Sequence, residues 1–341
     1  MSSTDQSELA RDAEAGDPRA QFEYALSILG GDTAAAEGLR AIELIDAASQ
    51  QGYADATAMC ALFEAMGAAR PQSWTHALDK LQEAAEGGSE SAQGQLLTLS
   101  GRGSGKSRRS GSGIDWSRLR ATLSVEKLLE PPSRQLLSDS PRIVAFPRFA
   151  TEAECNWCIA RARDGLKRAA VFHTRSGEQT YNAVRDNSCV EFQLPQMDLV
   201  LEVLRARIAA ATRLPVPIFE PVQVLNYAVG EQFRPHHDFL DPNAPGFAEQ
   251  IRRFGQRIAT VLVYLNDNYT GGNTVFPKIG LSYRGKAGDA LFFTNVDRTG
   301  HADPLTMHAG APPTSGEKWV ISQWIRDRAP ASPLATGAPA Q

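Results

Sequence analysis

The sequence predicts a multidomain α + β protein, with an N-terminal α-solenoid of helix pairs and a C-terminal antiparallel β-sandwich or jelly roll with flanking helices. Three observations support this fold class. The first segment repeats itself with a period of 36 residues, a Gly/Ser-rich stretch follows it, and the C-terminal third contains short β-rich runs separated by turn residues. A length of 341 residues also suits about two domains better than one core.

Composition excludes several classes of protein. With 22% charged and 42% hydrophobic residues, the chain is neither wholly disordered nor collagen-like. No stretch approaches the roughly 18 to 20 apolar residues that a membrane span needs. The first residues have neither the basic start nor the apolar run of a secretory signal, and 4 cysteines in so long a chain do not make a disulfide framework. We therefore expect a soluble, cytoplasmic protein.

The formal net charge of −4 combines two segments of opposite sign. Residues 1–100 carry 5 basic and 16 acidic side chains, a net −11, and the remaining residues carry a net +7. Such an acidic segment can attract a basic protein partner, or it can fold back on the basic part of the chain. The sequence leaves both possibilities open.

The N-terminal repeat occupies residues 1–99. Small and apolar residues recur at the spacing of 36, in three sets: Gly16, Gly52, Gly88; Ala20, Ala56, Ala92; Leu9, Ile45, Leu81. Small residues let paired helices approach closely, and each glycine suits a left-handed turn after the first helix of a pair. The region resembles Sel-one-type tetratricopeptide-like repeats, which implies a surface for a protein partner. A plain Ala-rich helical bundle is the alternative.

Two segments of low complexity flank the expected C-terminal domain. Residues 100–113, SGRGSGKSRRSGSG, consist of Gly, Ser and four basic residues, which predicts a flexible basic linker. The absence of interleaved aromatic residues favours a solvated linker over a nucleic-acid contact. Residues 329–341 are Pro/Ala-rich and indicate a disordered tail. The C-terminal domain is therefore expected at residues 114–328, with its core at 222–327.

This domain begins with helices and continues as strands. A Thr-x-x-Glu capping box at Thr151 and Glu154 predicts a helix over roughly Thr151 to Arg168, and apolar periodicity predicts another over roughly Gln196 to Ala211. Short β-rich runs follow: PVQVLNYAVG, RIATVLVYLND, NTVFP, DALFFT and EKWVISQWI. Because no long helices alternate with these runs, the sheet is expected to be mainly antiparallel.

The phrase FRPHHDFLDP contains the first candidate metal ligands. In an extended segment His236 and Asp238 point to one face, whereas His237 points away. His308 follows 70 residues after Asp238 and supplies a third ligand. Two histidines and one carboxylate form the facial triad of non-haem Fe(II) oxygenases. His-x-Asp alone is a weak signal, and the order of the following motifs strengthens it.

Lys318 lies 10 residues after His308 and opens the last β-rich run. Period two places Lys318, Ser322 and Trp324 on one face of that strand. A buried lysine needs an anionic partner, because an unpaired buried ammonium is costly. The distal carboxylate of a dicarboxylate co-substrate would be such a partner. The alternative is a surface lysine that lies along Trp319.

Residues 222 to 327 resemble the catalytic domain of the prolyl 4-hydroxylase family of 2-oxoglutarate- and Fe(II)-dependent dioxygenases. The similar blocks occur in the family's order: VQVLNYAVGEQFRPHHDF, ATVLVYLNDNYTGGNTVFPKIGL, KAGDALFFTNVD and DPLTMHAGAPPTSGEKWVISQWIR. The resemblance implies a double-stranded β-helix, a form of jelly roll. It implies that Fe2+ is bound by His236, Asp238 and His308. It implies that 2-oxoglutarate is bound by four residues: Lys318, Tyr227, Thr260 and Trp324. Arg185 is implied to contact the substrate.

The implied activity is hydroxylation of a peptidyl proline, with O2 consumed and 2-oxoglutarate decarboxylated to succinate and CO2. L-Ascorbate is implied as an auxiliary reductant, and the carboxylate ligand Asp238 favours hydroxylation over halogenation. The sequence departs from the family pattern at Gly285, at Ala311-Pro312 and around Arg185. Hydroxylation of another side chain or of a free amino acid therefore stays open, as does a non-catalytic interaction or sensor protein.

The remaining candidates have simpler interpretations. Cys155-x-x-Cys158 lies on an expected helix without a second cysteine pair, which favours packing over a redox or zinc site. His173 and His301 are expected to be surface residues. Four aromatic residues are assigned to the core: Tyr264, Phe276, Phe292 and Phe293.

Overall fold

The computed structural model describes residues 3–31, 34–103, 113–169, 171–172, 179–180 and 185–329. Its contacts divide the chain into two compact units. The first unit extends to Leu129 and also contains Gln193–Leu204, and the second contains Glu130–Phe192 and the chain from Arg205 to Pro330. Most of the predicted linker and nearly all of the predicted tail lie outside the described residues.

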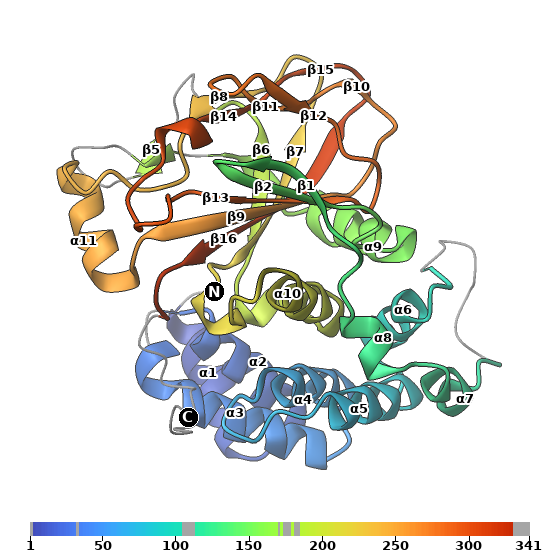
Figure 1. The fold of residues 1–341 in the computed structure, drawn as a ribbon. Coiled ribbons are helices and arrows are strands. Elements are labelled where there is room, and N and C mark those ends of the chain that lie inside the picture. The colour runs from blue at the N-terminus through green and yellow to red at the C-terminus, as the bar shows by residue number, and fades with distance from the viewer. Residues whose placement is uncertain are drawn as a thin grey trace. The chain divides into compact units, whose positions relative to one another are not determined.

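The first unit is helical, and each of its first six helices contacts the next. These helices are α1 (Ser3–Glu14), α2 (Pro18–Leu29), α3 (Ala34–Gln50), α4 (Ala54–Met66), α5 (Trp74–Glu86) and α6 (Glu90–Leu99). They form three pairs, one for each sequence repeat, and the colour gradient of Figure 1 follows them in chain order. The predicted left-handed glycines are confirmed, since φ is 94° at Gly16, 84° at Gly52 and 94° at Gly88.

The first unit extends further along the chain than the expected domain limit at residue 114. It includes α7 (Trp116–Ala121) and α8 (Val125–Leu129), because Trp116 and Leu119 are buried and Arg120 Nε donates to Asp79 Oδ1 at 3.0 Å. It also includes the 3-10 helix η1 (Leu194–Gln196) and the start of α10 (Leu199–Thr212). Leu199 N donates to Gln95 Oε1 at 2.9 Å, which ties this later segment to α6.

The second unit is built on two antiparallel sheets (Figure 1). The larger has the strand order β1 (Gln135–Asp139), β2 (Arg142–Phe146), β13 (Ala290–Thr294), β9 (Arg257–Tyr264), β16 (Lys318–Arg326), β7 (Val222–Tyr227), β6 (Ser188–Phe192) and β3 (Lys167–Arg168). The smaller has the order β12 (Leu281–Tyr283), β11 (Thr274–Phe276), β14 (His308–Gly310) and β8 (Phe233–His236). Two strand pairs remain: β10 (Thr270–Gly271) with β15 (Pro313–Ser315), and β4 (Val171–Phe172) with β5 (Gln179–Thr180).

The core of this unit lies between the two sheets. Leu225, Leu262 and Phe293 of the larger sheet form one buried cluster with Phe276 of the smaller one. Figure 1 shows the smaller sheet on one side of the larger, which is the arrangement of a jelly roll. The predicted antiparallel sheet is therefore confirmed, and all four aromatic residues assigned to the core are buried.

The second unit also contains α9 (Glu152–Arg163), the end of α10, α11 (Pro245–Phe254) and the 3-10 helices η2 (Val216–Ile218) and η3 (Pro304–Thr306). The predicted capping box is present at Thr151, but α9 ends at Arg163 and not at Arg168 because the chain there enters β3. Cys155 and Cys158 are free and buried, which confirms packing. No helix among the described residues is both long and apolar enough to cross a membrane.

Gly285 has a structural reason to differ from the family pattern. A Cβ atom at this position would lie 2.2 Å from Cδ2 of Tyr264, whose ring is fully buried. Such a contact is far inside van der Waals range. The close approach of the backbone to the Tyr264 ring therefore requires glycine at position 285.

Candidate metal centre

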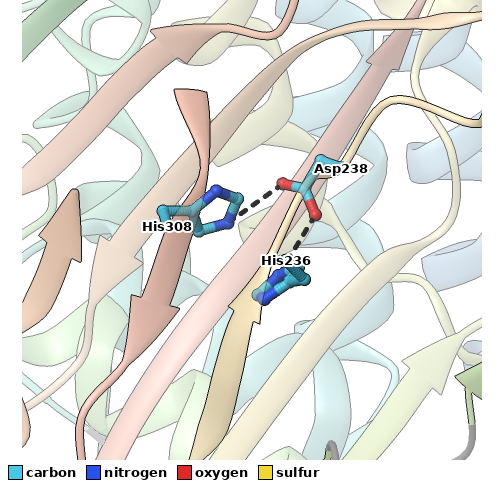
Figure 2. Close-up of side chains that lie close together, drawn as sticks. All are labelled: His236, Asp238 and His308. Atoms are coloured by element: carbon cyan, nitrogen blue, oxygen red, sulfur yellow. Dashed lines mark ion pairs between the residues drawn. The ribbon is translucent and has the colours of Figure 1, made fainter. Parts of the chain in front are cut away.

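The three predicted ligands meet at one edge of the smaller sheet (Figure 2). His236 ends β8 and His308 begins β14, and the pairing of these two strands places the two residues opposite each other. His236 Nε2 lies 3.6 Å from Asp238 Oδ1, and His308 Nε2 lies 3.5 Å from Asp238 Oδ2. One nitrogen or oxygen atom from each residue falls within 4.8 Å of the others, the spacing of a metal-binding group.

The local backbone differs slightly from the expectation. The sequence argument placed His236 and Asp238 on one continuous strand, whereas β8 ends at His236 and Asp238 follows it. The two side chains converge nevertheless, as Figure 2 shows. His237 is outside this group, and its Nε2 lies 3.3 Å from the backbone oxygen of Pro304.

Backbone carbonyl groups orient the two imidazole rings. Nδ1 of His236 lies 2.7 Å from the oxygen of Arg234, and Nδ1 of His308 lies 3.0 Å from the oxygen of Thr306. Each Nδ1 therefore carries the proton, which leaves the Nε2 lone pair facing Asp238. The ring of Phe233 stacks on His236 with centroids 3.4 Å apart and restricts its rotation.

Burial and charge set the ionisation of the group. Burial lowers the pKa of His308 to about 4, so its imidazole is neutral near pH 7. Burial alone would raise the pKa of Asp238, but the adjacent rings of His308 and His236 and the hydrogen bond from Thr260 hold it below the usual value. A neutral imidazole and an ionised carboxylate are the forms that bind a divalent metal ion.

Thr260 has a different position from the expected one. Its hydroxyl donates to Asp238 Oδ2 at 2.6 Å and does not line the pocket. Thr260 therefore orients a ligand instead of contacting a co-substrate. No spacing rule in the sequence connects residues 238 and 260, because their contact depends on how the chain after β8 packs against β9.

Lys318 lies in a pocket next to the three ligands. The pocket encloses about 420 Å³, part of it open to solvent, and Tyr227 and Trp324 also line it. The Lys318 side chain is 2% exposed, and its Nζ lies 5.1 Å from the ring centre of Tyr227 and 5.5 Å from that of Tyr264. It forms no ion pair among the described residues, and burial lowers its pKa to about 7. The expected alternative of a surface lysine is wrong.

Two hydroxyl groups accompany Lys318 in the pocket. Burial raises the pKa of Tyr227 to about 12, so it remains a neutral donor. Thr274 also lines the pocket, and its Oγ1 lies 2.8 Å from the hydroxyl of the buried Tyr264. Thr274 is not among the residues that the sequence predicts for the site, because a threonine in a short strand has no signal of its own.

Arg185 also lines this pocket. Its guanidinium lies 4.9 Å from the ring centre of Phe233, and its Nε donates to Asn187 Oδ1 at 3.1 Å. Its Nη2 is buried and has no hydrogen-bond partner among the described residues. His301 lies away from the ligands with its Nδ1 2.7 Å from Thr299 Oγ1, and His173 is outside the described residues.

These residues fit a non-haem iron ion and 2-oxoglutarate. The ligand group combines two imidazoles with one carboxylate, the donor set that Fe(II) oxygenases use. 2-Oxoglutarate also needs a buried cation to pair with its distal carboxylate. Lys318 is such a cation, because it has no acidic partner among the described residues.

Comparison with known proteins gives consistent matches. Residues 222–326 match the 2OG-Fe(II) oxygenase superfamily. The Arabidopsis thaliana protein named probable prolyl 4-hydroxylase 10 is 33% identical over 212 residues, which is 56% of this chain and 71% of that protein. Prolyl 4-hydroxylase 5 of the same plant is 35% identical over 211 residues, 56% of this chain and 70% of that protein. The viral collagen prolyl hydroxylase of Paramecium Bursaria Chlorella virus-1, solved with 2OG, is 27% identical with a TM-score of 0.41, covering 56% of this chain and 98% of that one.

The adjacent histidines allow a matched test of the metal centre. His236→Ala removes a ligand, and we expect it to weaken Mn2+ binding at least about 100-fold in titration calorimetry of the metal-free protein. His237→Ala removes an imidazole one residue away that does not face Asp238, and it should bind Mn2+ as the wild type does. Equal Mn2+ affinities of the two variants would contradict the assignment.

Proposed function

The chain belongs to the prolyl 4-hydroxylase family of 2OG-Fe(II) oxygenases, and on that premise we propose that it hydroxylates proline residues of a peptide or protein. The protein is an oxidoreductase of the dioxygenase class. One observation carries the proposal for its site: the group His236, Asp238 and His308 borders the same pocket as the unpaired Lys318. A metal site and an anion site are thus adjacent, as an oxidation coupled to 2-oxoglutarate requires.

Each side chain of the pocket has a defined task. Iron, with 2-oxoglutarate and O2, would supply the oxidising chemistry that inserts one oxygen atom into the substrate and the other into succinate. His236, Asp238 and His308 would hold the metal ion, and Lys318 would pair with the distal carboxylate of 2-oxoglutarate. The hydroxyls of Tyr227 and Thr274 can donate to that carboxylate, because both residues line the pocket beside Lys318. Trp324 forms part of the pocket wall.

Arg185 is proposed to bind the substrate. Its Nη2 hydrogens lack an acceptor among the residues that the structure describes, although the group is buried and the residue lines the pocket. A backbone carbonyl of a bound peptide would satisfy this donor. We include L-ascorbate as an auxiliary reductant on the family resemblance alone.

The helical region is proposed to hold a protein substrate near the catalytic domain. Residues 1–100 carry a net charge of −11, which favours partners with basic segments. We propose that residues 1–99 act as a short solenoid for such a partner, that residues 100–113 are a flexible linker and that the dioxygenase domain is the part of residues 114–328 that begins at Glu130. Three helix pairs with left-handed glycines at a spacing of 36 residues support the repeat interpretation.

Turnover with proline peptides tests the proposed function. With Fe(II), 2-oxoglutarate and O2, we expect succinate release together with a mass increase of about 16 Da on proline in a peptide library, measured by mass spectrometry. The His236→Ala variant should show neither, and His237→Ala should show both. Modification of another residue or of free proline alone would contradict peptidyl proline as the target, and no succinate above the His236→Ala level would contradict the enzyme.

The same assay tests Arg185. Arg185→Gln removes the unpaired donor, and we expect the KM for peptide to rise about tenfold while the KM for 2-oxoglutarate stays unchanged. A rise in both values would contradict a role that is limited to the substrate.

The pKa of Lys318 gives 2-oxoglutarate binding a characteristic pH dependence. Below pH 7 the lysine of the free protein is charged, so affinity should be independent of pH. Above pH 7 the lysine must take up a proton to pair with the carboxylate, so the Kd should rise by up to about tenfold per pH unit. In Lys318→Arg, whose guanidinium stays charged, the Kd should vary little between pH 6 and 9. A flat wild-type profile from calorimetry of the Mn2+-loaded protein would contradict the assignment.

Salt dependence tests the proposed recruitment. If the acidic region steers a basic protein substrate, then raising NaCl from about 50 to 300 mM should increase the KM for the protein but not for a short peptide that contains the same proline. Equal effects on both substrates would contradict recruitment by residues 1–99.

A further inference from the structure

A hydrogen-bond chain reaches Asp238 from outside the ligand group. Thr260 Oγ1 donates to Asp238 Oδ2 at 2.6 Å, and Asn295 Nδ2 donates to Thr260 Oγ1 at 3.0 Å. Asn295 and Thr260 are 0% and 1% exposed, so solvent does not compete for either bond. Asn295 lies directly after β13 and Thr260 lies within β9, which gives the chain a rigid support in the larger sheet.

The chemistry of the three groups determines the direction of this chain. An ionised carboxylate only accepts hydrogen bonds, and a hydroxyl has a single proton to donate. Because Thr260 donates that proton to Asp238, its oxygen can only accept from position 295. Asn295 must therefore present its amide nitrogen, and the hydrogen-bond network decides the orientation of the amide.

The oxygen of the Asn295 amide, unlike its nitrogen, has no hydrogen-bond partner in the part of the chain that the structure describes. This atom, Oδ1, is buried. An apolar side chain at this position would avoid the cost of burying an unpaired acceptor. Packing therefore does not account for an amide at residue 295, whereas donation to Thr260 does.

The backbone of Asn295 also contributes to the centre, by a separate route. Its carbonyl accepts from Asp303 N at 3.1 Å, the Asp303 carbonyl accepts from Thr306 N at 3.1 Å, and the Thr306 carbonyl lies 3.0 Å from His308 Nδ1. These bonds use main-chain atoms of Asn295, so a side-chain substitution leaves them in place. A variant at this position isolates the effect on Asp238.

We propose that Asn295 is a positioning residue of the metal centre, which acts through Thr260 to hold the carboxylate of Asp238 toward His236 and His308. The inference rests on the metal centre of the proposed function. Without the amide donor, the Thr260 hydroxyl is free to rotate, and the Asp238 carboxylate loses its fixed orientation. Groups that orient metal ligands in this way typically change metal affinity by about 10- to 100-fold when they are removed.

Mn2+ affinity of the metal-free protein tests this role without relying on turnover. We expect Asn295→Ala to raise the Kd for Mn2+ at least about tenfold and to shift the d–d absorption bands of bound Co2+. Thr260→Val should do the same, and Thr260→Ser, which keeps the hydroxyl, should behave as the wild type. The double variant Thr260→Val/Asn295→Ala should bind no more weakly than Thr260→Val within about twofold, because both changes break one chain.

Gln323 provides a matched control. It is also 0% exposed, its Nε2 donates to the oxygen of Glu220 at 2.7 Å and its Oε1 has no partner among the described residues. It lies on β16 between Ser322 and Trp324, whose side chains line the pocket, and therefore points to the opposite face. Gln323→Ala should leave the Kd for Mn2+ unchanged.

The outcomes separate this inference from the proposed function. Wild-type protein that binds no Mn2+ overturns both. Three results, each with normal Mn2+ binding by the wild type, overturn only the role of Asn295. They are a Kd of Asn295→Ala within twofold of the wild-type Kd, additive losses of affinity in the double variant, and a loss of affinity in Gln323→Ala equal to that in Asn295→Ala. If Asn295→Ala does not fold, a crystal structure of the Mn2+-bound wild type decides: an amide donating to Thr260 supports the role, and an amide turned away overturns it.

Discussion

Two charged side chains of opposite sign, Asp238 and Lys318, are buried in one pocket without forming an ion pair with each other. A buried charge without a partner costs on the order of several kcal/mol, so each group needs a counter-charge from elsewhere. Asp238 lies beside two imidazoles and accepts a hydrogen bond from a threonine hydroxyl, a set of groups that suits a metal ion. Among the described residues, Lys318 is surrounded by aromatic rings and hydroxyl groups and has no acidic neighbour. The protein thus leaves one cation and one anion to be supplied by ligands.

The two sheets keep these groups at a defined separation. His236 and His308 come from adjacent strands of the smaller sheet, whereas Lys318 lies on β16 near the middle of the larger one. The aromatic cluster between the sheets holds them in place, since Phe276 and Phe293 both pack against His308 and Tyr264 binds Thr274. The absence of a side chain at Gly285 leaves room for the Tyr264 ring. The packed core that stabilises the fold therefore also orients the side chains of the site.

The helical unit is held together by contacts between helices that follow one another in the chain. Its helices pack through alanines and leucines that recur with the sequence repeat, such as Ala56, Ala92 and Leu81, all of which are fully buried. Short-range periodicity decided this part of the fold, because each helix contacts mainly its neighbours in the chain. The limit of the unit was harder to anticipate. Trp116 and the segment Gln193–Leu204 belong to this unit because of burial and hydrogen bonds, which no local sequence pattern predicts.

The sequence by itself predicted the antiparallel sheet, the candidate ligand group and the buried lysine. Three properties can be seen in the sequence alone: the periodicity of the strands, the spacing of His236, Asp238 and His308, and the order of the family's blocks. Only the tertiary structure brought Thr260, Thr274 and Asn295 to their partners, because each contacts a group from another strand or from across the sheets. Ligands are recognised by their residue type and spacing, whereas a supporting hydroxyl or amide is ordinary in sequence and becomes specific only through the partner that folding brings within 3 Å.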